Sequence, residues 1–232
     1  MPSNTQPALR ARGLGRRFGR DWALAHVDLE VAPGETMVLA GANGSGKTTL
    51  LRLAAGLYRP SRGGVEIFGL DPQRERIECR RAMSMVSHQA YIYDRLTALE
   101  TLRVWARLLG RPASDADLLP LLASVGLDRR LRLQVSGFSA GMRKRLTLLR
   151  TRLEQPRLLL LDEPFSALDV EGKHQVEDWI LEAREAGAAV VMASHAVRRA
   201  GRLCDRAVLL ERGQIVWRGD GDGLVERLGE TA

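Results

Sequence analysis

The segment "GANGSGKT", from Gly41 to Thr48, constrains the fold of this chain more than any other stretch. It fits the phosphate-loop pattern G-x-x-x-x-G-K-[ST] and stands between the apolar run "TMVLAG" and the helically spaced run "KTTLLRLAAGL". Glycines let successive N–H groups turn toward phosphate oxygens, and the N-terminus of the following helix adds positive charge. We therefore predict a nucleoside triphosphate site formed by Gly41, Ala42, Asn43, Gly44, Ser45, Gly46, Lys47, Thr48 and Thr49.

Two side chains of this loop carry the expected chemistry. Lys47 supplies a point charge for the β- and γ-phosphates, and Thr48 offers its hydroxyl to Mg²⁺. The alternative, a glycine-rich turn with a chance lysine, is disfavoured because both flanking segments fit the pattern.

A pair of carboxylates follows the apolar run "LLLLDEP", Leu158 to Pro164. Asp162 ends the predicted strand and is placed to hold Mg²⁺, and Glu163 is placed to polarise an attacking water. Taken alone, two adjacent carboxylates after a strand also fit the start of a turn. Together with the phosphate loop, they predict the second half of a hydrolytic site.

The patterning around these motifs predicts a parallel sheet. The runs "LLLLDEP" and "GAAVVMASH" are strand-like and are separated by the helical run "VEGKHQVEDWILEAREA", which is the alternation of a βαβ unit. Upstream, "WALAHVDLEV" alternates apolar and polar residues before the turn "APGE" and predicts a half-buried strand with a hairpin. Near the other end, "RAVLLERGQIVWRG" predicts a closing hairpin.

Between Gln89 and the strand-like run "LLLLDEP", two runs have the spacing of amphipathic helices. They are "LTALETLRVWARLLG" and "ASDADLLPLLASVGL", and glycines and a proline separate them. We therefore expect a helical insert within the sheet domain.

Composition excludes several classes of protein. The 232 residues, 45% of them hydrophobic and 27% charged, are typical of one soluble globular domain. The formal charge of +7 is weak support for nucleic-acid binding, because only Lys47, Lys144 and Lys173 are lysines and the excess reflects general arginine usage. Cys79 and Cys204 lack metal-type spacing, so we expect free thiols. No run approaches the roughly 18 apolar residues of a membrane span, so we expect a cytosolic polypeptide.

Three further motifs fix the resemblance. "FSAGMRKRLTLLR" precedes the carboxylate pair, and "SALD", Ser166 to Asp169, and "SH", Ser194 and His195, follow it. This order of motifs resembles that of the ATP-binding-cassette ATPases. In that family's terms the motifs are the phosphate loop (GANGSGKT), the glutamine loop (Gln89), the signature (FSAGM), Walker B (LLLLDEP), the D-loop (SALD) and the switch histidine (His195). The resemblance covers Phe18 to about Arg218. It implies an α/β phosphate-loop NTPase fold, with a RecA-like parallel-sheet core, an N-terminal antiparallel β subdomain and an inserted helical subdomain.

The resemblance also implies a domain plan and the cofactors. The chain is expected to form a single nucleotide-binding domain over residues 1–232, with a core at about 1–89 and 157–220 and a helical subdomain at about 90–156. ATP and Mg²⁺ are the implied cofactors.

Residue roles follow from the same resemblance. Gln89 is expected to contact Mg²⁺ or the attacking water, which makes Thr48, Gln89 and Asp162 the implied metal ligands. Glu163 is the implied general base, and His195 the implied contact to the γ-phosphate. Phe18 is expected to stack on adenine, with an ordinary core phenylalanine as one alternative and stacking by Trp22 as another.

The signature departs from the usual "LSGGQ" of the family. It comprises Phe138, Ser139, Ala140, Gly141 and Met142, so the hydroxyl and the close-approach glycine are retained while a methionine replaces the amide. In this family the signature of one subunit completes the phosphate site of another. The resemblance therefore implies a head-to-tail homodimer with two ATP molecules, in which Ser139, Ala140, Gly141 and Met142 act in trans beside the D-loop residues Ser166 and Asp169.

Transport is the favoured function class. A lone cassette without a coiled coil resembles an exporter subunit, which implies transmembrane permease partners and a peripheral location on the cytoplasmic side of the inner membrane. "SHQAYIYDRLTALETL", together with "FSAGMRKR", resembles the ATPase of the haem exporter used in c-type cytochrome maturation. Export of a drug, lipid or polysaccharide, and a soluble nucleic-acid-associated ATPase, are the alternatives.

The motifs bear on three possible partners: haem, nucleic acid and a membrane protein. Direct haem binding is not expected, because there is no C-x-x-C-H motif and no histidine in a ligand setting. Nucleic acid is not an expected partner. Tyr91, Tyr93 and the helix start at Leu96 to Leu102 are predicted to dock a cytoplasmic helix of the membrane partner.

Overall fold

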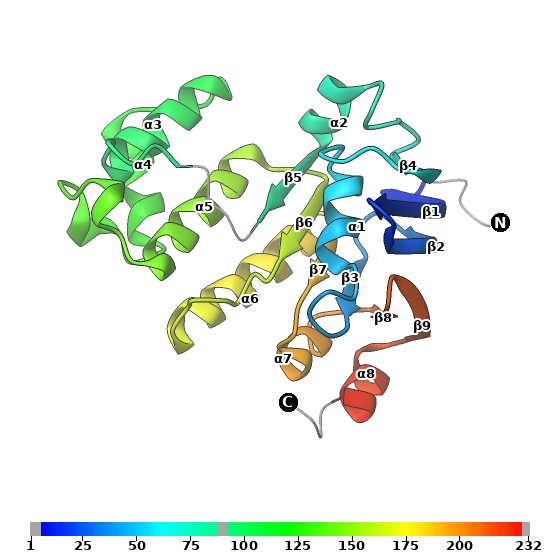
Figure 1. Ribbon diagram of the computed structural model, residues 1–232. Coiled ribbons are helices and arrows are strands. Elements are labelled where there is room, and N and C mark those ends of the chain that lie inside the picture. The colour runs from blue at the N-terminus through cyan, green and yellow to red at the C-terminus, as the bar shows by residue number, and fades with distance from the viewer. Residues whose placement is uncertain (1–5, 88–91, 229–232) are drawn as a thin grey trace. The chain divides into compact units, whose positions relative to one another are not determined.

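The computed structural model describes residues 6–87 and 92–228, which form two compact units (Figure 1). The core unit comprises the described residues of 1–85, 156–164 and 180–232, and the helical unit comprises those of 86–155 and 165–179. The helical unit thus includes residues 165–179, which the expected domain plan assigned to the core.

A six-stranded sheet forms the centre of the core unit. Its order is β5 (Met83–Val86), β6 (Leu158–Asp162), β7 (Ala189–Ala193), β3 (Thr36–Ala40), β8 (Arg206–Glu211) and β9 (Gln214–Gly219). β3 pairs in parallel with β7 and β8, β6 pairs in parallel with β7, and α6 (Val170–Glu185) joins β6 to β7. This confirms the predicted βαβ unit, and the antiparallel β8–β9 pair confirms the closing hairpin.

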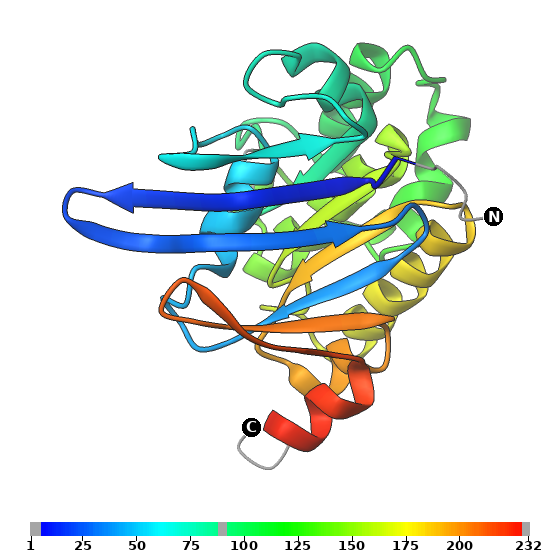
Figure 2. The same cartoon turned by 90° about the vertical axis from the view of Figure 1, so that its right-hand side faces the viewer.

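A second, antiparallel sheet contains β2 (Asp21–Val31), β1 (Leu9–Phe18) and β4 (Arg62–Ile67), in that order, and Figure 2 shows β1 and β2 as a long ribbon. The hairpin predicted after β2 was wrong, because β2 pairs with the preceding β1 while β3 enters the parallel sheet. Every residue of β3 is buried, so this strand needs cover on both faces, which a half-exposed hairpin does not provide.

Helix α1 (Lys47–Ala54) packs between the two sheets. It contacts β2 and β4 of the antiparallel sheet and β6 and β7 of the parallel sheet. Leu50, Leu51 and Leu53 of this helix belong to one buried cluster with residues of both sheets, including Leu14 and Leu39. Two sheets therefore fix the helix that follows the phosphate loop.

Short helices complete the core unit. They are α2 (Arg76–Ala82), α7 (Val197–Gly201) and α8 (Gly221–Leu228). α7 contacts α8 and β3, and α8 also contacts β8. No helix within residues 6–87 and 92–228 is long and apolar enough to cross a membrane.

The helical unit has a core of its own. α3 (Ala98–Leu108), α4 (Asp115–Ala123) and α5 (Ala140–Glu154) are joined through two 3₁₀ turns, η1 (Asp128–Arg130) and η2 (Val135–Gly137). α3 and α4 confirm the two predicted amphipathic helices. Their buried faces meet α5 in one apolar cluster, which includes Leu102, Trp105, Leu118, Leu146 and Leu149.

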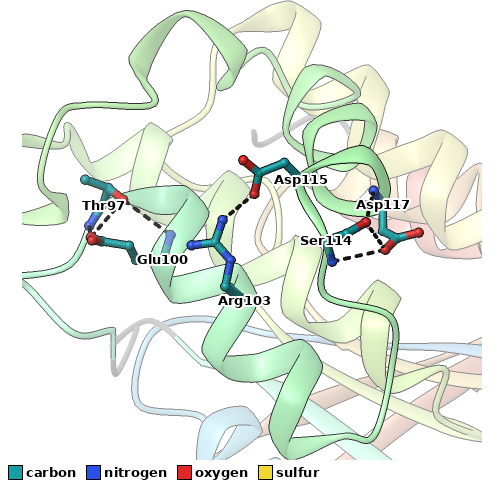
Figure 3. A network of polar contacts seen from close by, with 6 residues as sticks. All are labelled: Thr97, Glu100, Arg103, Ser114, Asp115 and Asp117. Atoms are coloured by element: carbon teal, nitrogen blue, oxygen red, sulfur yellow. Dashed lines mark hydrogen bonds and ion pairs between the residues drawn. The ribbon is translucent and has the colours of Figure 1, made fainter.

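Reciprocal caps fix the starts of α3 and α4 (Figure 3). Thr97 Oγ1 accepts a hydrogen bond from the N–H of Glu100 at 3.3 Å, and Glu100 Oε2 accepts one from the N–H of Thr97 at 2.8 Å. Ser114 and Asp117 form the same box at α4, and Arg103 of α3 is ion-paired with Asp115 of α4. Glu100 is therefore held in the helix start.

Replacing the cap of α3 should destabilise the chain. We expect Thr97→Ala to lower the free energy of unfolding by about 1 kcal/mol, because a backbone N–H at the helix start loses its acceptor. Urea denaturation followed by circular dichroism measures this change. The exposed neighbour Arg95, changed to Ala, serves as the control and should shift it by no more than about 0.5 kcal/mol. Equal stability of the Thr97 variant and the wild type would contradict the capping role.

Candidate functional site

The phosphate loop depends on glycines with positive φ. Gly41, Gly44 and Gly46 have φ values of 138°, 80° and 111°, a region that other residues rarely adopt. A Cβ at Gly41 would lie 2.2 Å from the carbonyl oxygen of Leu210, and one at Gly46 would lie 2.6 Å from that of Ala23. Both positions therefore require glycine for space as well as for conformation.

Lys47 is held inside this loop. Only 6% of the residue is exposed, and Nζ donates to the carbonyl oxygens of Gly41 at 2.6 Å and Ala42 at 3.0 Å. Burial lowers the pKa of Lys47, and the negative charges of Glu163 and Asp162 partly oppose that shift. The ammonium group thus donates to two backbone carbonyl oxygens, and phosphate oxygens are expected to replace them when nucleotide binds.

Thr48 and Asp162 place two oxygen atoms together at the end of β6. Thr48 Oγ1 donates to Asp162 Oδ1 at 3.0 Å, and only 3% of Asp162 is exposed. Mg²⁺ prefers oxygen ligands and commonly takes one or two carboxylates beside substrate phosphates, so this pair fits the ion. Bound there, Mg²⁺ supplies positive charge against the phosphate oxygens. Because Thr48 directs its hydroxyl hydrogen at Asp162, the lone pairs of its oxygen stay available to the metal.

The side chains of Glu163 and His195 meet at the same end of the sheet. Glu163 follows β6, His195 follows β7, and these strands are parallel neighbours with Asp162 opposite Ala193. His195 Nδ1 lies 2.7 Å from Glu163 Oε2, and the His195 side chain is 70% exposed against 17% for Glu163. A largely shielded carboxylate beside an exposed imidazole is suited to accept a proton from water.

A pocket of about 610 Å³ lies beside the phosphate loop. The segments Gly41–Ser45, Ser194–His195 and Leu209–Arg212 line it, together with Val197 and Leu228. Its volume is in the range of small-molecule sites, and all of its lining belongs to the core unit.

The signature residues lie at the N-terminus of α5 in the helical unit. Ser139 is the N-cap, and its Oγ accepts a hydrogen bond from the N–H of Met142 at 3.2 Å. A Cβ at Gly141 would lie 2.7 Å from the carbonyl oxygen of Ala167, so glycine is needed for the approach of the SALD segment. Met142 packs against the core of the helical unit, so its side chain serves as packing where the family has a polar amide. Ala140 is exposed.

Comparison with known proteins identifies the family of this chain. The family model described as "ABC transporter" matches residues 24–166. The chain belongs to the ABC transporter family. It is 35% identical to an uncharacterised ABC transporter ATP-binding protein of Bacillus subtilis (strain 168), YdbJ, over 90% of this chain and 68% of that protein.

A second ABC relative matches over almost the whole of both chains. The glutamine transport ATP-binding protein GlnQ of Escherichia coli (strain K12) is 33% identical, over 93% of this chain and 92% of that protein. The solved structure of an ATP-binding subunit of an ABC transporter superposes with a TM-score of 0.85 at 30% identity, over 96% of this chain and 93% of that one.

Membership of the ABC family supplies the general activity. The chain is an ABC ATPase that binds ATP with Mg²⁺ and couples hydrolysis to transport. ABC ATPases dimerise and work with transmembrane permease subunits.

Phe18 and Trp22 are the two aromatic residues that the sequence offered as the ring for base stacking, which stays a prediction. Both are exposed, at 43% and 41%. The Arg16 guanidinium lies 4.6 Å from the Phe18 ring centre, and Tyr58 meets that ring edge-on at 5.5 Å. Guanidinium groups of Arg17 and Arg62 lie 5.9 Å and 5.7 Å from the Trp22 ring.

Some residues that ABC motifs single out lie elsewhere. Gln89 and Tyr91 fall outside the described residues, so the glutamine loop stays a prediction. Ser166 and Asp169 lie in the helical unit beside α5, as residues of its 165–179 segment. The sequence analysis did not single out Arg16 and Tyr58 beside Phe18, and no signal marked the arginine in a chain so rich in that residue.

Proposed function

We propose that the chain is the ATP-hydrolysing subunit of an export complex and that it works as a head-to-tail homodimer. In this proposal it binds transmembrane permease subunits at the cytoplasmic side of the inner membrane. The Glu163–His195 pair at 2.7 Å, in the same unit as Lys47 and the Thr48–Asp162 pair, is the observation that supports hydrolysis. Export, the homodimer and the membrane location are proposed from the family resemblance.

Each site residue has one task in the proposed cycle. Lys47 exchanges its two carbonyl partners for the β- and γ-phosphates. Glu163 accepts a proton from the attacking water, and His195 leaves Glu163 to contact the γ-phosphate. Ser139 of a second copy caps the same phosphate from the N-terminus of its α5. Gln89 is proposed to contact Mg²⁺ or the water.

We propose Phe18 as the stacking ring. The resemblance supports Phe18, because an aromatic residue upstream of the phosphate loop is the family's habit. The Phe18 ring meets one guanidinium group and the edge of Tyr58, and the Trp22 ring meets two guanidinium groups. We expect Phe18→Ala to raise the Kd for Mg-ATP at least about fivefold, since base stacking contributes about 1–3 kcal/mol. Isothermal titration measures it, with Trp22→Ala as the matched control. A loss confined to the Trp22 variant would reverse the assignment.

Haem export is the proposed specific function. The segment "SHQAYIYDRLTALETL" and the "SAG" signature support it through their resemblance to the haem exporter ATPase. Clean deletion of the gene should abolish covalent haem attachment to c-type cytochromes, measured by haem staining of membrane fractions. Intact cytochromes in a strain without a second copy would remove haem as the cargo and would leave a drug, lipid or polysaccharide exporter.

A nucleic-acid-associated ATPase is the competing class. The formal charge of +7 favours it, but general arginine usage explains that charge. Binding to DNA through phosphates weakens steeply with salt, and a functional interaction would raise the hydrolysis rate. We expect no DNA-stimulated hydrolysis at 150 mM salt. Stimulation that disappears on adding salt would favour this class.

A further inference from the structure

A carboxylate in the helical unit joins three segments. Arg145 of α5 donates from Nη2 to Asp169 Oδ1 at 2.5 Å, and the N–H of Gly172, in the first turn of α6, donates to the same oxygen at 2.9 Å. Asp169 is the last residue of the SALD segment, Ser166 to Asp169. One oxygen atom therefore links α5, the SALD segment and the start of α6.

Backbone close approaches surround this contact. A Cβ at Gly172 would lie 2.8 Å from Asp169 Oδ1 and 3.1 Å from Arg145 Nη2. On α5, a Cβ at Gly141 would lie 2.7 Å from the carbonyl oxygen of Ala167, which itself has a φ of 62°. Gly141 and Arg145 are four residues apart and so lie on one face of α5. That face meets the SALD segment at two places.

The arginine is itself fixed from a second side. Its side chain is only 17% exposed, and Nη1 also points to the carbonyl oxygen of Val125 at 3.4 Å. Exposed ion pairs contribute little because both side chains remain free to move. Here the guanidinium group contacts both the segment after α4 and the SALD segment, which restricts its freedom.

We propose that Arg145 is a positioning residue that holds the SALD segment against the first turns of α5. The signature and the SALD segment are then presented to a second copy of the chain as one rigid block. This inference rests on the proposed function, in which both segments act on the ATP of the partner. Asp169 serves as the anchor within its own chain.

The charge state of Asp169 agrees with an anchor. The hydrogen bond from the N–H of Gly172, followed by the side chain of Arg145, holds the pKa of the Asp169 carboxyl below its usual range. The carboxylate is thus ionised throughout the neutral range in which the protein would work.

Four single variants of the full chain, and the double variant that combines Arg145→Ala with Asp169→Asn, test the inference. Arg145→Ala removes the contact, Arg145→Lys keeps the charge without the planar fork, and Asp169→Asn removes the anchor charge. Arg152→Ala is the matched control, because this arginine of the same helix contacts Ser124 at 3.3 Å, also in the segment after α4. Three quantities are measured: the Kd for Mg-ATP, kcat for ATP hydrolysis, and hydrogen exchange of the peptide 165–172.

Loss of the anchor should reduce turnover without reducing nucleotide binding. For Arg145→Ala and Asp169→Asn we expect the Kd for Mg-ATP to stay within about twofold and kcat to fall at least about tenfold, with Arg145→Lys between them and the wild type. The kcat of the double variant should fall no further than that of either single variant, because the two residues act as one unit. Exchange should rise in 165–172 alone.

Several outcomes overturn the inference: wild-type kcat in folded Arg145→Ala, equal losses in Arg152→Ala, or additive losses in the double variant. If Arg145→Ala does not fold, Asp169→Asn carries the same test. Failure of the wild type to hydrolyse ATP or to dimerise would instead overturn the proposed function. The hydrogen-exchange measurement needs no nucleotide. Unchanged exchange of residues 165–172 in Arg145→Ala and Asp169→Asn would by itself contradict the proposed anchoring role.

Discussion

Glu163→Gln should trap an ATP-bound dimer and lower kcat by about 10²- to 10⁴-fold, the usual contribution of a general base. The amide has the shape of the carboxylate, and its oxygen still accepts a hydrogen bond from His195, so the site should keep its packing. It accepts no proton from water at neutral pH, so ATP stays intact between the two copies. Phosphate release and light scattering with saturating Mg-ATP measure the two effects.

The control for this change is an exposed glutamate of the same unit. Glu226 lies on α8 and is exposed, so Glu226→Gln should keep the wild-type rate and should not accumulate a dimer. A Glu163→Gln variant that stays monomeric with saturating Mg-ATP would contradict the proposed cycle. A variant that retains full turnover would remove Glu163 as the base.

Lys47→Met should raise the Kd for Mg-ATP at least about 100-fold, or about 2.7 kcal/mol. The ammonium group donates to two carbonyl oxygens at 2.6 Å and 3.0 Å, and we expect it to donate to two phosphate oxygens instead. Hydrogen bonds to charged groups contribute about 1.5–3 kcal/mol each, so losing two of them accounts for the change. Methionine keeps an unbranched side chain in the loop without its charge.

Equilibrium dialysis with Mg-ATP measures this affinity. Lys173 of α6 provides the matched control, because Lys173→Met removes the same charge from the helical unit and should leave the Kd within about twofold. Thermal unfolding of both variants tests that they fold. Wild-type affinity in folded Lys47→Met would remove the lysine from the nucleotide site.

The fold was predictable where burial and pattern agree. The buried strands β3, β6 and β7 read as apolar runs, and the phosphate loop fixes the order strand, loop, helix. β1 was missed because its arginines and three register shifts break the alternation that marks a half-buried strand. The partner of β2 was mispredicted for the same reason, since the turn "APGE" offered the next strand as the nearest candidate.

Contacts within the site were less predictable than its residues. Parallel neighbours bring the ends of β6 and β7 together, so the nearness of Glu163 and His195 follows from strand order. The attachment of Lys47 to loop carbonyls depends on loop geometry that no spacing rule encodes. Arg145 and Asp169 are 24 residues apart in sequence, and only packing within the helical unit joins them.

A mixing experiment tests most directly whether two copies build each ATP site. Lys47→Met spoils the phosphate loop, and Ser139→Glu puts a negative charge where the signature should cap the γ-phosphate. Each variant alone should hydrolyse ATP at the background rate. An equal mixture should recover about a quarter of the wild-type rate, because half of the dimers are mixed and each has one intact site. Wild-type turnover by Ser139→Glu alone, or no recovery on mixing, would contradict the account.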